Sequence, residues 1–259
     1  MSKPHIILVH GAYHRAWHLQ PLKAELERNG YAVSTLDLPA AGPDPEKLPV
    51  TGGLRADTDA IKTLMEEVAA KSESMIAVLH SYGGIPGGEA AAELSEGARK
   101  KLKRLVYLAA LVIPQGSSLF KPTGGKTGAA WAQQRDHIVF VPDPVPTFYH
   151  DCNPELAKEA ARHVVPHSYS CFNEDTEHTP GAICPCTYVF TVNDRPVPIS
   201  VQKMMLEHGV KKEHRDHWET YTLDTGHSPF LSDTIGCARL VRRIAGEEIP
   251  DLLPSALQL

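Results

Sequence analysis

The sequence predicts an α/β protein with a mostly parallel six-stranded sheet, helices on both faces and one inserted segment. Apolar runs alternate with amphipathic runs at helical spacing, which is typical of β-α-β units. The first apolar run, His5–Val9, lacks polar alternation, as expected for a strand that is buried on both faces. The alternation stops at residue 113 and resumes near 184. We therefore expect a core made of residues 1–112 and 184–259, with residues 113–183 inserted as a cap over the end of the sheet.

The first half of the chain supplies four of the six expected strands and three helices. The first helix carries leucines at helical spacing and is followed by Gly30, a common C-terminal cap. Residues 39–53 are rich in proline and glycine and are expected to form a loop. The expected strands are His5–Val9, Tyr31–Leu38, Met75–Leu79 and Leu105–Val112, and the expected helices are Trp17–Arg28, Ala56–Ala70 and Ile85–Leu94.

The second half supplies the cap and the remaining core elements. Residues 113–183 are rich in proline, glycine, histidine and aromatic residues, and they contain two short helical patterns, Ala129–Arg135 and Pro154–His163. The tail after Pro250 is expected to fray. The remaining expected elements are the strands Thr187–Val192 and His217–Leu223 and the helices Ile199–His208 and Ser232–Ala245.

Composition restricts the class of protein. The formal net charge of −5 over 259 residues argues against a nucleic-acid-binding or anionic-membrane surface. No apolar run approaches the roughly 18 residues of a membrane span, and the first apolar stretch is too short for a signal-peptide core. The five cysteines are odd in number in a large chain, which favours reduced thiols and a cytoplasmic location. The oligomeric state stays open, a homodimer included.

A serine lies on the sharpest predicted turn. Met75–Leu79 is a buried strand, His80 and Ser81 follow it, and two glycines lead into a helical pattern. This approximates the G-x-S-x-G turn that lifts a nucleophilic serine above a sheet. Leu79 replaces the first glycine, and a large residue there is expected to crowd the turn. Ser81 is nonetheless the predicted nucleophile, and the backbone N–H of the residue after it, Tyr82, is the predicted oxyanion donor.

An acid and a base follow later strands in the order that such a serine requires. Sites form at the carboxyl ends of parallel strands, where Asp194 and His227 are placed. A serine hydroxyl needs a base, so His227 is the candidate general base and Asp194 the carboxylate that orients it. Asp224 is the competing acid, but its position favours a turn-capping role. The acids of the cap, Glu174, Asp175 and Glu177, are expected to be surface charges.

Four blocks of sequence carry a resemblance to a known family. They are His10–Leu19, His80–Gly84, Tyr188–Pro198 and Asp224–Phe230. Through them the chain resembles the α/β-hydrolase superfamily, in the branch of plant hydroxynitrile lyases, small methyl-ester esterases and related fungal hydrolases. The resemblance implies an α/β-hydrolase fold, a cap over the active site, a Ser-Asp-His triad and Ala12 as the second oxyanion donor.

The same resemblance separates two chemistries. The cyanohydrin-cleaving relatives carry a lysine directly after the catalytic histidine and a threonine in the first oxyanion loop. This chain has Ser228 and Gly11 at those positions. The esterase-like interpretation is therefore favoured over the lyase.

The substrate pocket is expected to draw on aromatic residues of the cap and on the first oxyanion loop. Aromatic side chains commonly line apolar pockets. The residues expected to line the pocket are Trp131, Phe148 and Phe172 of the cap and Tyr13 and His14 beside the oxyanion loop.

Two other motifs are set aside. The stretch Gly124–Thr127 resembles a phosphate-binding loop, but Phe120 holds the required first glycine position. Cys184 and Cys186 with His178 form a weak metal pattern.

The sequence thus predicts a serine hydrolase without metal or cofactor, acting on a small ester, lactone or related acyl substrate. Two alternatives stay open. One is a lyase that uses the same triad to cleave a cyanohydrin or a C–C bond. The other is a ligand receptor on a hydrolase scaffold.

Overall fold

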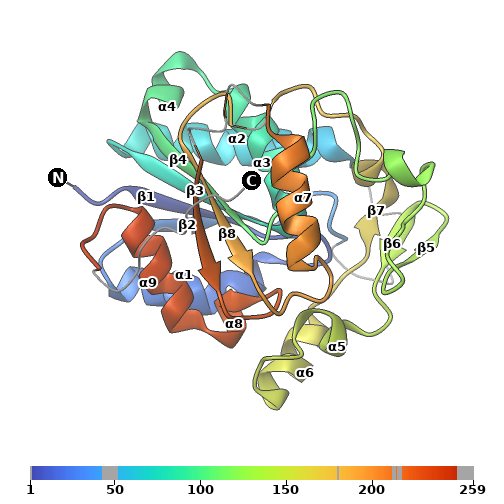
Figure 1. Cartoon of the computed structure of the whole chain (residues 1–259). Helices are drawn as coiled ribbons and strands as arrows, with labels where there is room; N and C mark the ends of the chain where they lie inside the picture. The colour runs from blue at the N-terminus through green and yellow to red at the C-terminus, as the bar shows by residue number, and fades with distance from the viewer. Residues whose placement is uncertain (1, 43–51, 180, 212–213, 215–217, 250–259) are drawn as a thin grey trace.

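A six-stranded sheet forms the centre of the protein in the computed structural model, which describes residues 2–42, 52–179, 181–211, 214 and 218–249 (Figure 1). All neighbouring strands are parallel, in the order β2-β1-β3-β4-β8-β9. The predicted fold class is confirmed. The strands are β1 (His5–Val9), β2 (Val33–Thr35), β3 (Met75–His80), β4 (Leu102–Leu108), β8 (Cys186–Thr191) and β9 (Trp218–Leu223).

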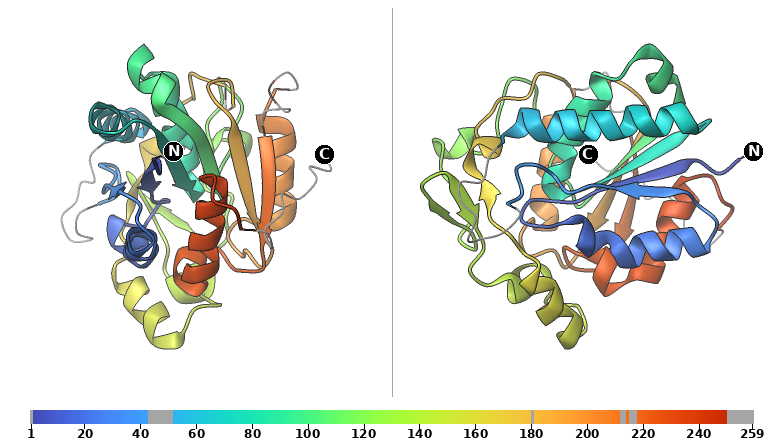
Figure 2. Two further views of the ribbon diagram at one scale, coloured as in Figure 1. Left: turned by 90° about the vertical axis from the view of Figure 1, so that its left-hand side faces the viewer. Right: turned by 180° about the vertical axis from the view of Figure 1, so that it is seen from behind.

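Helices cover both faces of this sheet. Helices α1 and α9 lie against one face, and α2, α3 and α7 lie against the other (Figures 1 and 2). Each packs through an apolar stripe; on α2 this stripe includes Ile61, Met65 and Val68. The core helices are α1 (Gln20–Arg28), α2 (Leu54–Lys71), α3 (Gly84–Ala92), α4 (Glu96–Lys101), α7 (Ile199–Gly209), α8 (Pro229–Ser232) and α9 (Thr234–Ile244).

The strand register aligns the carboxyl ends of the strands. Val9 pairs with Leu79, and Leu79 pairs in turn with Tyr107. All six residues of β3 and all six of β8 are buried, which agrees with their mostly apolar sequences. Loops that leave these strands therefore emerge together at one edge of the sheet.

Some predicted boundaries were wrong. The strand predicted over Leu105–Val112 begins at Leu102 and ends at Leu108, because Ala109 has a left-handed φ of 47° that stops the extended backbone. β2 covers only the middle of the predicted Tyr31–Leu38, and α4 was not predicted. Residues 43–51 of the predicted loop, His217 of the last predicted strand and the tail after Pro250 lie outside the described residues.

Most of the predicted insertion, residues 113–183, lies beyond the carboxyl ends of the core strands, and its last residues run back to the start of β8 (Figure 1). A three-stranded antiparallel sheet, in the order β5-β6-β7, forms part of it. A helix predicted over Ala129–Arg135 is wrong, because Arg135 pairs with Ile138 in a tight hairpin whose Asp136 has φ 52°. The elements are β5 (Gln133–Arg135), β6 (Ile138–Phe140), β7 (His167–Ser168), α5 (Pro144–Phe148) and α6 (Pro154–Arg162).

Within the described ranges, no helix is both long enough and apolar enough to cross a membrane.

Candidate active site

Ser81 occupies a left-handed turn at the end of β3. Its φ is 52°, which is unfavourable for a residue with a side chain and is commonly found where strain serves a site. The Leu111 N–H donates to the Ser81 carbonyl at 2.9 Å, and α3 begins three residues later at Gly84. A Cβ atom at Gly11 would lie 2.7 Å from the Ser81 Cβ, so the first loop approaches the serine as closely as a glycine allows.

Leu79 does not crowd the turn, contrary to the sequence-based expectation. Its side chain is fully buried and lies over Gly87, one helical turn into α3. A Cβ atom at Gly87 would lie 2.4 Å from the Leu79 Cδ2, so this glycine makes the room that the missing glycine would have made. Gly83 does the same beside β1, where a Cβ atom would lie 2.6 Å from the His10 carbonyl oxygen.

His227 and Asp194 complete a hydrogen-bonded chain with Ser81. His227 Nε2 lies 3.1 Å from Ser81 Oγ, and His227 Nδ1 lies 2.7 Å from Asp194 Oδ2. Both side chains are almost fully buried. The second carboxylate oxygen of Asp194 accepts the Val197 N–H at 2.8 Å, and Oδ2 also accepts the Thr191 hydroxyl at 2.9 Å. The carboxylate is therefore fixed with one oxygen directed at the imidazole.

Hydrogen bonds between loops fix the position of His227. The Asn193 N–H donates to the Thr225 carbonyl at 3.0 Å, and the Asn193 amide donates to Asp224 Oδ1 at 2.8 Å. The Asp224 carboxylate thus ties two loops together and does not bond His227. From the insertion, Asp151 accepts the Gly226 N–H at 2.5 Å.

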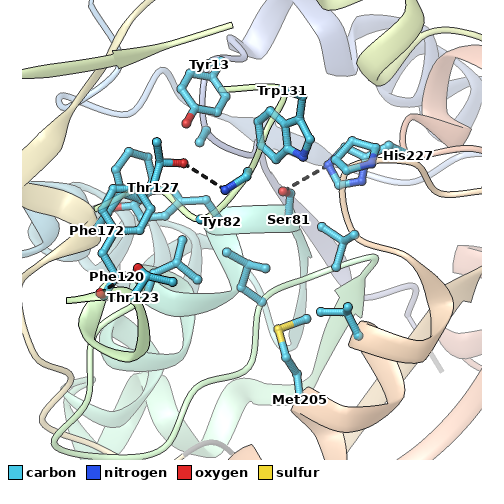
Figure 3. Close-up of a pocket in the computed structure, with 18 of the residues that line it drawn as sticks. Tyr13, Ser81, Tyr82, Phe120, Thr123, Thr127, Trp131, Phe172, Met205 and His227 are labelled. Atoms are coloured by element: carbon cyan, nitrogen blue, oxygen red, sulfur yellow. Dashed lines mark hydrogen bonds between the residues drawn. The ribbon is translucent and has the colours of Figure 1, made fainter. Parts of the chain in front are cut away.

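A cavity of about 240 Å³ opens above Ser81 (Figure 3). Ala12, Tyr82 and His227 line it together with Ser81. Of the described residues that line it, none is a lysine, arginine, aspartate or glutamate. The other lining residues are Tyr13, Leu111, Leu119, Phe120, Thr123, Thr127, Gly128, Ala129, Trp131, Phe148, Phe172, Pro196, Val197, Val201 and Met205.

Four of the five residues predicted for the pocket lie on its wall, and His14 does not. Tyr13, Trp131, Phe148 and Phe172 line the cavity. His14 is 1% exposed and lies behind the wall, where its ring packs edge-on against Phe148 with the ring centroids 5.0 Å apart.

Sequence reasoning missed the side of the cavity that the core supplies. Val201 and Met205 lie on α7, which follows Asp194 within a few residues and returns along the site (Figure 3). Leu111 follows β4. The sequence held a signal for these two residues. The helix that became α7 was predicted to begin shortly after Asp194, and residues 201 and 205 are four apart, on one face of it.

Buried histidines surround the site. Burial lowers the pKa of His10 to about 4 and the pKa values of His18 and His167 to about 3, and it lowers those of His14 and His80 well below the ordinary value. Each of these rings is fully or almost fully buried. They are neutral at physiological pH, and both ring nitrogens of His10, His14 and His18 take part in hydrogen bonds.

Among the described residues, two side-chain groups have metal-like spacing, and neither includes Cys184 or Cys186. The buried group is Asp57, His167 and Cys171. The Tyr13 N–H donates to His167 Nδ1 at 3.4 Å, so the proton of the neutral ring lies on Nε2, the nitrogen that faces Asp57. A metal-binding Nε2 would need that proton removed, so this group does not fit a metal.

The second group is Glu93, Glu177 and His178, on the surface. Arg55 and Lys62 already pair with Glu93, and their positive charges disfavour a cation.

Comparison with known proteins places these features in context. Residues 6–240 match a family model described as the alpha/beta hydrolase family. The chain is 28% identical to "Alpha/beta hydrolase nvfD" of Aspergillus novofumigatus over 260 residues, covering 96% of this chain and 99% of the relative. It is 39% identical to salicylic acid-binding protein 2 of Nicotiana tabacum over 108 residues, covering 42% of this chain and 40% of the relative.

Solved structures show the same fold. A pyrethroid hydrolase from Sphingobium faniae superposes with a TM-score of 0.74 at 21% identity, covering 94% of this chain and 98% of that one. Polyneuridine aldehyde esterase superposes with a TM-score of 0.73 at 20% identity, covering 94% of this chain and 100% of that one.

Proposed function

The chain belongs to the alpha/beta hydrolase family, and from this premise we propose that it is a serine esterase whose nucleophile is Ser81. His227 is the general base, and Asp194 holds its ring. The observation that carries the proposal is the hydrogen-bonded chain from Ser81 Oγ through His227 to Asp194, at 3.1 and 2.7 Å, which meets the cavity at the serine oxygen.

The reaction proceeds in two halves. His227 Nε2 takes the proton of Ser81 as Oγ attacks the ester carbonyl, and the carbonyl π electrons move onto oxygen. The backbone N–H groups of Ala12 and Tyr82 stabilise this oxyanion. The intermediate collapses, the C–O bond to the alcohol breaks, and His227 donates the proton to the leaving oxygen. Water then attacks the acyl-enzyme, and His227 takes its proton and returns it to Ser81 as the acid leaves.

Asp194 supports both halves without becoming protonated. Its Oδ2 accepts a hydrogen bond from the N–H at His227 Nδ1, so the proton of the neutral ring stays on Nδ1 and Nε2 is unprotonated and directed at Ser81. When the ring becomes positively charged, the buried carboxylate beside it stabilises that charge. Its bonds to Thr191 and Val197 keep it in place through the cycle.

The wall of the cavity favours a small, uncharged ester. A substrate bearing a free carboxylate or an ammonium group would lose its hydration there without gaining a charged partner. The names of several similar proteins refer to ester cleavage, including a methylesterase of Arabidopsis thaliana and an esterase of rice, which supports this class. Lactones share the same carbonyl chemistry and fall within the proposal.

The residues next to the site favour hydrolysis over cyanohydrin cleavage. Ser228 follows His227 and is fully buried, and Gly11 precedes Ala12. Among the described residues of the cavity wall, no lysine is present to offset the charge of a departing cyanide.

Replacement of the nucleophile tests the proposal. The variant Ser81→Ala should lower kcat for p-nitrophenyl acetate by about 10⁴-fold or more, because the residual rate comes from binding and the oxyanion donors alone. Ser232→Ala, which changes a serine outside the cavity, is the matched control and should keep the wild-type rate. Full turnover by Ser81→Ala would overturn the mechanism. So would cyanohydrin cleavage without ester hydrolysis.

A cytosolic location is also proposed. All five cysteines are free, as expected in a reducing compartment.

A further inference from the structure

The peptide group that joins Ala12 to Tyr13 lies between two histidine rings. The Ala12 carbonyl is 2.8 Å from His14 Nδ1, and the Tyr13 N–H is 3.4 Å from His167 Nδ1. A carbonyl oxygen can only accept, so His14 carries its proton on Nδ1. A backbone N–H can only donate, so His167 has no proton on Nδ1. The two rings are opposite tautomers and hold opposite ends of one peptide group.

Another side chain lies behind each ring, within hydrogen-bonding distance only at His14. The Tyr149 hydroxyl lies 3.1 Å from His14 Nε2, which is the unprotonated nitrogen and therefore accepts. His167 Nε2, which carries the proton, faces Asp57 Oδ2 at 3.8 Å, and the same oxygen accepts the Tyr82 hydroxyl at 2.9 Å. Tyr149 and His167 belong to the insertion, whereas Asp57 and Tyr82 belong to the core.

The Ala12–Tyr13 peptide, called the clamped peptide below, leads into a residue with a strained backbone. Tyr13 has φ 67°, an unfavourable value for an aromatic residue, and the Val165 N–H of the insertion donates to its carbonyl at 2.9 Å. Strain of this kind persists only where surrounding contacts determine the conformation. The dihedral angles of Ala12, which aim its own N–H, depend on the orientation of this peptide.

We propose that His14 and His167 are positioning residues: they hold the Ala12–Tyr13 peptide so that the Ala12 N–H points at the developing oxyanion. Through Tyr149 and His167, the insertion thereby sets the rate of turnover as well as the shape of the pocket. This inference rests on the proposed function, in which the Ala12 N–H is an oxyanion donor. Neither ring lines the cavity, so both act through the backbone.

Burial keeps the His14 and His167 rings in one protonation state. It lowers the pKa of His167 to about 3 and that of His14 well below its ordinary value. Both rings stay neutral in neutral solution, so the donor and acceptor roles do not change there.

Variants at His167 test this positioning role, because they differ in whether and where the side chain offers a hydrogen-bond acceptor to the Tyr13 N–H. His167→Phe removes the acceptor, His167→Asn keeps one near the position of Nδ1, and His167→Gln keeps one near the position of Nε2. We expect His167→Phe to lower kcat for a p-nitrophenyl ester by about 10- to 100-fold with KM within about twofold. His167→Asn should recover most of kcat and exceed His167→Gln by about tenfold. Tyr149→Phe, which loses only the hydroxyl behind His14, should lower kcat by about threefold.

An inhibitor that forms a tetrahedral adduct with Ser81 separates a loss of oxyanion stabilisation from a general disturbance of the site. A trifluoromethyl ketone adds to Ser81 and places a negative oxygen where the oxyanion forms, so its inhibition constant should rise in proportion to the fall in kcat. His18→Phe is the matched control, because His18 is equally buried and donates to the Ala160 carbonyl of the insertion at 3.1 Å without bonding the clamped peptide. It should leave both quantities within about threefold of wild type.

Three results would overturn the inference. One is a kcat for His167→Phe within twofold of wild type. Another is a lower kcat with an unchanged inhibition constant. The third is equal kcat for His167→Asn and His167→Gln, a comparison that holds even if His167→Phe fails to fold. A fluorophosphonate that labels Ser81 in every folded variant shows that the proposed function stands, whereas a wild-type protein unlabelled at Ser81 refutes the function itself.

Discussion

The ends of the core strands and the insertion contribute to the same site in different ways. Ser81, Asp194 and His227 follow β3, β8 and β9, whose pairing fixes where each loop begins. The insertion has strands of only two or three residues and contributes Trp131, Phe148 and other aromatic side chains to the cavity wall. The sheet therefore places the proposed catalytic residues, and the cavity wall of the insertion determines which substrates fit. Variants of the catalytic residues should consequently fail in kcat and variants of that wall in KM, whereas His167 and Tyr149 of the insertion are expected to act on kcat through the Ala12–Tyr13 peptide.

The largest effect is expected at the acid of the sheet edge. Asp194→Asn should lower kcat by about 10³- to 10⁴-fold, because an amide no longer holds the His227 tautomer that leaves Nε2 free. Asp224→Asn is a matched control, since Asp224 accepts from Asn193 and not from His227. Steady-state kinetics on p-nitrophenyl acetate compare the two. A similar loss in both variants would show that the acid is assigned to the wrong residue.

Buried histidines of the core and the insertion should make the fold sensitive to acid. A buried histidine with a lowered pKa stays neutral in the folded protein while the unfolded chain takes up a proton. Stability from such groups is therefore present above about pH 6.5 and is lost as the pH falls. His10, His18 and His167, with pKa values of about 4, 3 and 3, belong to this class.

Asp57 acts in the opposite direction. Burial raises its pKa to about 6, so the folded protein binds its proton before the unfolded chain does, and acid relieves the cost of burying its charge. From pH 7 to pH 5.5 these three histidines cost about 4 kcal/mol and Asp57 returns about 1. His14 and His80, whose pKa values burial also lowers, add to the loss, so it should be at least about 3 kcal/mol. Urea unfolding at the two pH values measures this, and equal stabilities would contradict it. His18→Phe should reduce the loss by about 1 kcal/mol.

A smaller effect tests how the serine turn is built. Gly87→Ala would normally favour a helix, but here it should destabilise the protein by about 1–3 kcal/mol, because its Cβ would meet Leu79. The double variant Leu79→Ala with Gly87→Ala should recover part of that loss in urea unfolding. Additive losses in the double-mutant cycle would show that the two residues do not share the space.

The smallest effect is expected on the wall of the insertion. Trp131→Ala should raise KM for a naphthyl ester by about tenfold and leave kcat for acetate esters within about twofold, because the indole contacts substrate only through the wall. Phe140→Ala changes an aromatic residue of the insertion that does not line the cavity and should leave KM unchanged. A fall in kcat without a change in KM for Trp131→Ala would show that Trp131 acts on the chemical step and not through the wall.

The sheet and the strand-end residues were predictable because their signals are local. An unbroken apolar run predicts a buried strand, and a reactive side chain directly after it falls at the carboxyl edge whatever the rest of the chain does. Ser81, Asp194 and His227 were predicted in this way, and the structure brings them within hydrogen-bonding distance of one another. Leu79 was misjudged, because the glycine that accommodates it lies eight residues later, in α3.

The insertion was less predictable because its contacts are distant in sequence. Nothing in the sequence near His167 or His14 indicates that the two rings meet at one peptide group. His167 lies 154 residues from Tyr13 along the chain. The three-residue β5 gives no periodicity, so a short helical pattern over Ala129–Arg135 was misleading. Val201 and Met205 were missed because pocket residues were sought in the insertion and beside the first oxyanion loop, whereas α7 supplies part of the wall.

The most direct test of the central claim is to map the residue that reacts with a fluorophosphonate. We expect one label per chain, on the peptide that contains Ser81, at a rate that falls sharply in His227→Ala because the serine then lacks its base. Ser81→Ala should take up no label. Stoichiometric labelling of another residue, or a wild-type protein that hydrolyses esters while Ser81 stays unmodified by the probe, would contradict it.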